Sequence, residues 1–271
     1  MSERMKIVAA SGKIFQMILL DNEDDLAVHG ADLIAKTIED KNGNAVLCFA
    51  TGSTPLPVYR ELIRRYQAKQ ISFAKVHAFM LDEYIGLGPD DPNSFRYYMS
   101  QKLFSQIDIP EDQVHCYSGP VEDHMQSCFR YERAIKELGG IDMMLLGIGR
   151  NGHIAFNEPG CTIDSRCRLI KLTDDTRRAN ARFFESLDQV PQHALSMGIG
   201  NILEVKQLMM MATGSSKSEA VFNMLRGPVD SMVPASSLQM YNGECHLLID
   251  RAASTELLEY RLDQSRKSNP V

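Results

Sequence analysis

Short apolar runs alternate with segments of helical spacing along most of the chain. The predicted strands cover residues 15–20, 45–50, 75–81, 141–146, 207–213 and 246–250. The predicted helices cover residues 23–39, 57–67, 93–104, 121–138, 191–203 and 216–225. Alternation on this scale predicts an α/β fold, with one open, mostly parallel, doubly wound sheet and helices on both of its faces.

The length of 271 residues suits one α/β domain with a large core, so we expect a single domain over residues 1–271. Hydrophobic residues make up 44% of the chain and charged residues 24%, an ordinary mixture for a soluble globular protein. Residues 159–190 are polar and irregular, and residues 263–271 have the composition of a flexible tail.

Charge and cysteine usage narrow the class of protein. The formal net charge of −6 disfavours a nucleic-acid partner, although it leaves room for a local basic pocket. No apolar stretch approaches the length of a membrane span, and residues 1–16 lack a signal-peptide pattern. The six cysteines are scattered without a CxxC pair or zinc spacing, which predicts reduced thiols and no bound metal. We therefore expect a cytoplasmic protein with no membrane partner.

The turn after the predicted strand 141–146 carries the most chemistry. Residues 147–159 read GIGRNGHIAFNEP, and the glycines permit a tight turn that brings Asn151, His153 and Glu158 together. Histidine carries a proton near neutral pH, and a carboxylate five residues on can orient it. The residues alone leave a second interpretation open, in which His153 only caps backbone groups.

Two adjacent carboxylates, Asp82 and Glu83, directly follow the predicted strand 75–81. In an extended chain their side chains point to opposite sides, so one can face a cleft as a base while the other is structural. An ordinary acidic loop start is the alternative.

Two other strand ends have the composition of anion-binding turns. Glycine and small hydroxyl residues let backbone amides converge at the start of a helix, which favours a phosphate. The first turn is formed by Thr51, Gly52, Ser53 and Thr54. The second leads into Lys217, and Arg182 of the irregular segment could grip the same anion. Plain helix capping is the alternative for both turns.

These four strand ends would surround one crevice at the carboxyl edge of the sheet. Two anion-binding turns, one carboxylate base and a His/Glu pair suit proton transfer on a phosphorylated sugar without a cofactor. The chain has no nucleophile elbow, no GxGxxG motif and no metal-ligand cluster in its sequence.

Longer motifs make the chain resemble the glucosamine-6-phosphate deaminases over residues 16–250, nearly its whole length. The resemblance rests on residues 81–87 (LDEYIGL), 149–159 (GRNGHIAFNEP), 165–166, 175–184 (DTRRANARFF), 190–191 and 234–238 (PASSL). It implies a Rossmann-like sheet and the conversion of glucosamine 6-phosphate and water to fructose 6-phosphate and ammonium. It also implies that residues 168–196 form a mobile lid.

The resemblance also implies roles for single residues. Asp82 matches the base that moves a proton between C2 and C1, and His153 matches the group that opens the sugar ring, with Glu158 as its partner. The positions that match the phosphate-binding residues are Thr51, Gly52, Ser53, Thr54, Arg182 and Lys217. Asn151 stands where many family members have Asp, which removes a negative charge beside His153 but keeps a hydrogen-bond acceptor.

One departure concerns regulation. Allosteric members of the family bind an acetylated sugar phosphate through a serine after the Glu-Pro pair and a downstream Arg-x-Lys. In this chain Cys161 replaces the serine, Arg168 is kept, and Ile170 stands at the lysine position, with Lys171 one step further. Because Ile170 offers neither charge nor donor, we expect no such activation.

Other functions stay open at this point. A galactosamine-6-phosphate deaminase is the nearest alternative. A 6-phosphogluconolactonase shares the Gly-His turn but not the Phe-Asn-Glu-Pro continuation at residues 156–159. A non-enzymatic sugar-phosphate sensor would need a DNA-binding segment, and none precedes residue 16. The expected partner is a small sugar phosphate, and a homo-oligomer is left open.

Overall fold

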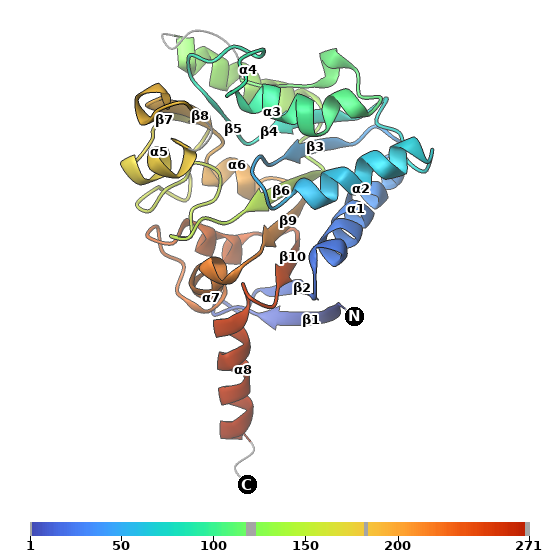
Figure 1. Cartoon of the computed structure of the whole chain (residues 1–271). Helices are drawn as coiled ribbons and strands as arrows, with labels where there is room; N and C mark the ends of the chain where they lie inside the picture. Colours follow the sequence, from blue (N-terminus) through green and yellow to red (C-terminus); the bar gives the residue numbers. More distant parts are fainter. Residues whose placement is uncertain (1, 118–122, 182–183, 269–271) are drawn as a thin grey trace.

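The main body is a seven-stranded sheet in a computed structural model that describes residues 2–117, 123–181 and 184–268 (Figure 1). In sheet order its strands are β1 (Glu3–Val8), β2 (Ile14–Leu20), β10 (Glu244–Asp250), β9 (Gln207–Ala212), β6 (Met143–Gly147), β3 (Val46–Phe49) and β4 (His77–Met80). All neighbouring strands are parallel except β1 and β2, which form an antiparallel pair. This arrangement confirms the predicted α/β class.

Helices flank the sheet (Figure 1). They are α1 (Glu23–Asp40), α2 (Leu56–Gln67), α3 (Phe95–Lys102), α4 (His124–Glu137), α5 (Asp174–Asn180), α6 (Ile199–Leu203), α7 (Ser218–Arg226) and α8 (Thr255–Ser268). Helix α1 begins where the sequence predicted, because the Asn22 side chain accepts a hydrogen bond from the Asp25 amide at 2.9 Å.

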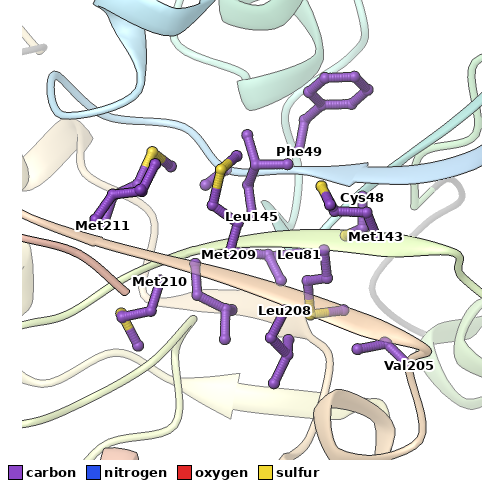
Figure 2. Close-up of a cluster of buried hydrophobic side chains, with 14 of the residues drawn as sticks. Cys48, Phe49, Leu81, Met143, Leu145, Val205, Leu208, Met209, Met210 and Met211 are labelled. Atoms are coloured by element: carbon purple, nitrogen blue, oxygen red, sulfur yellow. The ribbon is translucent and has the colours of Figure 1, made fainter. Parts of the chain in front are cut away.

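The core lies on both sides of the central strands. All four residues of β3 are buried, and so are Met143 to Leu146 of β6 and Leu208 to Ala212 of β9. Figure 2 shows methionines of β6 and β9 packed with Cys48, Phe49 and Leu145. Fully burying one such side chain contributes about 1.5–3 kcal/mol, so this cluster fixes the central strands and therefore the loops that follow them.

A smaller antiparallel sheet, in the order β5-β8-β7, was not predicted. Its strands are β5 (Asp82–Tyr84), β8 (His193–Ser196) and β7 (Arg168–Lys171). The predicted helix over residues 191–203 is therefore wrong in its first half, because residues 193–196 pair with a strand on each side. Helix α6 starts only after Gly198, where a Cβ atom would lie 2.1 Å from the Ser165 carbonyl oxygen.

The end of the chain also differs from expectation. Helix α8 projects away from the sheet (Figure 1) and includes residues 263–268 of the predicted flexible tail, while 269–271 lie outside the described residues. The helix is held at its base, where Tyr260 accepts a hydrogen bond from Arg226 at 2.7 Å. Among the described residues, no helix is long and apolar enough to cross a membrane.

Candidate active site

The carboxyl ends of β9, β6, β3 and β4 meet at one edge of the sheet, since these strands are consecutive and parallel. The chain reverses its direction across the sheet at β3, which has the later strands β4 and β6 on its two sides. A reversal of this kind opens a crevice at the strand ends. The four loops singled out in the sequence all begin at this edge.

Asn151, His153 and Glu158 form a continuous hydrogen-bonded relay. The Asn151 side-chain amide donates to Glu158 Oε2 at 2.8 Å, so Asn151 Oδ1 faces the other way. That oxygen lies 2.8 Å from His153 Nδ1, which must therefore carry the hydrogen. The relay leaves His153 Nε2 free to exchange a proton with a ligand.

The glycines of this turn make room for the imidazole. A Cβ atom on Gly149 would lie 2.3 Å from His153 Nδ1 and Cε1, far inside contact distance. Gly152 has a φ of +79°, and a Cβ atom there would lie 2.8 Å from Val233. The sequence signal of closely spaced glycines thus reflects packing of the ring against bare backbone.

Glu158 is ionised over the physiological range. Burial opposes its ionisation, but the neighbouring His153, Thr176 and Asn151 outweigh burial and lower the pKa of Glu158 to about 2. Its side chain is 16% exposed and lies 3.6 Å from His153 Nδ1. Glu158 therefore presents a fixed negative charge to the histidine turn at neutral pH.

Asp82 and Glu83 differ in their hydrogen bonding, and Glu83 is the structural one of the two. Glu83 accepts hydrogen bonds from the amides of Tyr84, Phe95 and Arg96 at 2.8, 2.9 and 2.8 Å, so it anchors the start of α3. Asp82 is only 8% exposed. Burial, with a smaller contribution from the charge of Glu83, raises the pKa of Asp82 to about 8. A carboxyl poised near neutral pH is suited to proton transfer.

The two expected anion-binding turns are not occupied by helix capping. Helix α2 starts at Leu56 behind Pro55 without a side-chain cap, which leaves the hydroxyls of Thr51, Ser53 and Thr54 free of that task. Gly52 in this turn has a φ of +98°, and its carbonyl accepts a hydrogen bond from Tyr98 at 2.6 Å.

Lys217 lies between the second turn and the histidine turn. Its Nζ donates to the Ile148 carbonyl at 2.7 Å, which brings the lysine to the end of β6. Burial, together with the nearby charge of Arg150, lowers the pKa of Lys217. A bound anion would offset both effects. Arg182, the other expected phosphate ligand, lies outside the described residues.

Sequence reasoning missed one residue of this site, Thr176. Its hydroxyl, on α5, donates to Glu158 Oε1. The signal was present as the motif at residues 175–184, but the motif does not reveal which side chain turns toward Glu158.

A groove of about 640 Å³ lies elsewhere, at the opposite edge of the sheet where β6 and β9 begin. Phe129 of α4 lines it, together with Arg166 and Glu204, which form an ion pair at 2.5 Å. It contains none of the candidate residues. Among the described residues, no group of three or more His, Cys, Asp or Glu side chains is arranged to hold a metal ion.

Comparison with known proteins agrees with this geometry. The model of the family described as glucosamine-6-phosphate isomerases/6-phosphogluconolactonase matches residues 21–247. The chain belongs to this family. A glucosamine-6-phosphate deaminase from Bacillus pumilus is 44% identical over 88% of this chain and 98% of the relative. A glucosamine-6-phosphate deaminase from Bacillus velezensis is 45% identical over 85% of this chain and 95% of the relative.

Solved structures of the family have the same architecture. A glucosamine-6-phosphate deaminase described as monomeric superposes with a TM-score of 0.84 at 42% identity, covering 88% of this chain and 98% of that one. A 6-phosphogluconolactonase from Trypanosoma brucei superposes with a TM-score of 0.72 at 19% identity, covering 89% of this chain and 98% of the lactonase. The second likeness concerns the fold alone.

Proposed function

We propose that this chain is a glucosamine-6-phosphate deaminase, which converts glucosamine 6-phosphate and water to fructose 6-phosphate and ammonium. The observation that carries the proposal is a buried carboxyl, Asp82, at the same sheet edge as the Asn151–His153–Glu158 relay. Aldose–ketose isomerisation needs a base for C2, and ring opening needs a second proton carrier. This site has one group for each task.

We assign opening of the sugar ring to His153. Because Nδ1 is hydrogen-bonded to Asn151, Nε2 takes the proton of the C1 hydroxyl and returns one to the ring oxygen. The fixed charge of Glu158 stabilises the imidazolium between the two steps. Asn151 transmits the orientation of Glu158 to the ring, which is why its amide can replace a carboxylate here.

Asp82 then moves the proton from C2 to C1. In the free protein its pKa of about 8 leaves much of it protonated at neutral pH. The substrate carries an ammonium group on C2, and a cation beside a buried carboxyl favours the ionised form. An amino sugar thus activates the base that attacks it, and water hydrolyses the resulting imine to release ammonium.

We propose that the substrate phosphate is held by Thr51, Gly52, Ser53, Thr54 and Lys217, with Arg182 as a further ligand. Hydroxyls without a capping role, backbone amides at the start of α2 and a half-buried ammonium provide the donors that a phosphate requires. We further propose that the chain acts as one domain in the cytoplasm, with residues 168–196 closing over the substrate.

An assay for ammonium release tests the function, because ammonium is the product common to both amino sugars, and fructose 6-phosphate is measured as the second product from glucosamine 6-phosphate. Glucosamine 6-phosphate, galactosamine 6-phosphate and 6-phosphogluconolactone are compared at equal concentration, with hydrolysis of the lactone followed by its acid release. We expect turnover of glucosamine 6-phosphate to exceed that of its C4 epimer, and no hydrolysis of the lactone above background. Preferential turnover of the epimer would change the substrate, and preferential hydrolysis of the lactone would refute the reaction.

A further inference from the structure

The proton relay of the site continues into the segment expected to form the lid. Glu158 accepts from Asn151 through Oε2 and from Thr176 of α5 through Oε1, so its two oxygens are held from two different segments. Thr176 in turn lies 3.0 Å from the Thr173 hydroxyl. A chain of polar contacts therefore runs from the first turn of α5 to the imidazole of His153.

The direction of these hydrogen bonds is determined by their partners. A carboxylate can only accept, so the Thr176 hydroxyl proton must point to Glu158. The Thr176 oxygen is then the acceptor for the Thr173 hydroxyl. Thr173 also caps α5, since its Oγ1 accepts from the Thr176 amide at 3.2 Å. Thr176 is thus held at both its backbone and its hydroxyl by the cap of its own helix.

Glu158 itself belongs to the turn after β6, whereas Thr176 belongs to α5. Without Thr176 the carboxylate would keep the Asn151 contact on one oxygen and lose its partner on the other. A glutamate side chain has three rotatable bonds, and one hydrogen bond does not fix the orientation of its carboxylate plane. The pose of Glu158, and through Asn151 that of His153, therefore depends on where α5 lies.

We propose that Thr176 is a positioning residue that assembles the ring-opening relay when α5 is in place over the site. The inference rests on the proposed function. It couples the position of α5 to the orientation of the Glu158–Asn151–His153 relay, because Thr176 and Asn151 hold the two oxygens of the same carboxylate.

The test compares Thr176→Val, which keeps the shape and removes the hydroxyl, with Thr176→Ser, which keeps the hydroxyl. Thr162→Val is the matched control, because Thr162 is exposed and lies outside the relay. Each variant is assayed for ammonium release from glucosamine 6-phosphate and from an analogue without the C4 and C5 hydroxyls, which has neither a furanose nor a pyranose form. Thermal melting and inhibition by inorganic phosphate report on folding and on phosphate binding.

Loss of a hydrogen bond to a charged group predicts that Thr176→Val lowers kcat for glucosamine 6-phosphate by at least about tenfold. The defect should shrink on the analogue, inhibition by phosphate should not change, and Thr176→Ser and Thr162→Val should stay near wild type. An equal defect on both substrates, or none on either, would overturn the role of Thr176. Should Thr176→Val melt early, the serine variant decides, because a serine with the valine defect would also overturn it. Failure of the wild type to release ammonium would instead refute the proposed function, and this inference with it.

Discussion

Replacing the proposed base by its amide, Asp82→Asn, should stabilise the protein while it removes activity. Asp82 is 8% exposed and receives no hydrogen bond from another described side chain in the structure, so its charge is poorly solvated. Burial raises its pKa from 3.8 to about 8. The native state therefore binds one more proton than the unfolded state between these values, and the free energy of unfolding falls as pH rises through this window.

The size of the effect follows from the same shift. A change from 3.8 to about 8 corresponds to on the order of 5 kcal/mol of lost stability once the pH exceeds the folded pKa. Asparagine carries no charge, so Asp82→Asn avoids this loss. Burying its amide offsets part of the gain, and we expect the variant to be more stable than wild type by roughly 2–4 kcal/mol at pH 8. At pH 4, where the folded wild type holds Asp82 protonated, the advantage should disappear and the variant should be no more stable than wild type.

Asp142→Asn is the matched control, and its expected effect on the free energy of unfolding has the opposite sign. Asp142 is also buried, at the amino end of β6, and burial opposes its ionisation. Lys206 and Lys41, each 2.8 Å away, outweigh burial and lower the pKa of Asp142. Its stabilising contribution is present above the unfolded pKa near 4 and is lost as pH falls through the folded value. Asp142→Asn should therefore destabilise the protein by about 1–3 kcal/mol at pH 7.

Urea unfolding of the wild type and both variants between pH 4 and pH 9 measures these differences. The stability advantage of Asp82→Asn should grow with pH and level off above the folded pKa, while Asp142→Asn stays below wild type. If Asp82→Asn is no more stable than wild type at pH 8, then Asp82 is not the buried, poorly solvated carboxyl that the mechanism uses.

Three further predictions concern the histidine turn and regulation. His153→Gln should lower turnover of glucosamine 6-phosphate by roughly 10²–10⁴-fold, and by less for the analogue without the C4 and C5 hydroxyls. Equal losses on both substrates in steady-state assays would make His153 purely structural. Gly149→Ala should lower kcat by about 10²-fold, because its Cβ displaces the imidazole; unchanged kcat would contradict that packing. N-acetylglucosamine 6-phosphate should leave saturation kinetics hyperbolic and the half-saturation concentration unchanged, because Ile170 packs in an apolar cluster and offers no charge to a phosphate. Activation by this compound would reveal a working effector site near Arg168.

The central strands could be predicted from sequence because their apolar runs are bounded by glycine, proline and acidic residues. The strand β1 does not stand out in the sequence, because three of its six residues, ERMKIV, are charged and only Ile7 is buried at this edge of the sheet. The sequence of β8, His-Ala-Leu-Ser, suits a helix or a strand equally well, and only its pairing with β5 and β7 decides for the strand.

The residues of the site also differ in how far the local sequence predicts their contacts. Asn151, His153 and Glu158 lie within one short turn, so local sequence was enough to predict that they meet. Thr176 is eighteen positions from Glu158 in the chain, and its contact depends on how α5 folds back. Strand alternation predicts that the side chains of Asp82 and Glu83 point to opposite sides, but that Glu83 is the structural one depends on the amides at the start of α3.

The fate of the C2 hydrogen tests the central claim most directly. Glucosamine 6-phosphate deuterated at C2 is followed by NMR in ordinary water with the wild type and with Asp82→Asn. We predict slowed formation of fructose 6-phosphate by the wild type, with part of the deuterium at C1, and a rate roughly 10²–10⁴-fold lower for Asp82→Asn. Turnover by Asp82→Asn within about tenfold of wild type would contradict the account, as would fructose 6-phosphate formed with neither a slowed rate nor deuterium at C1.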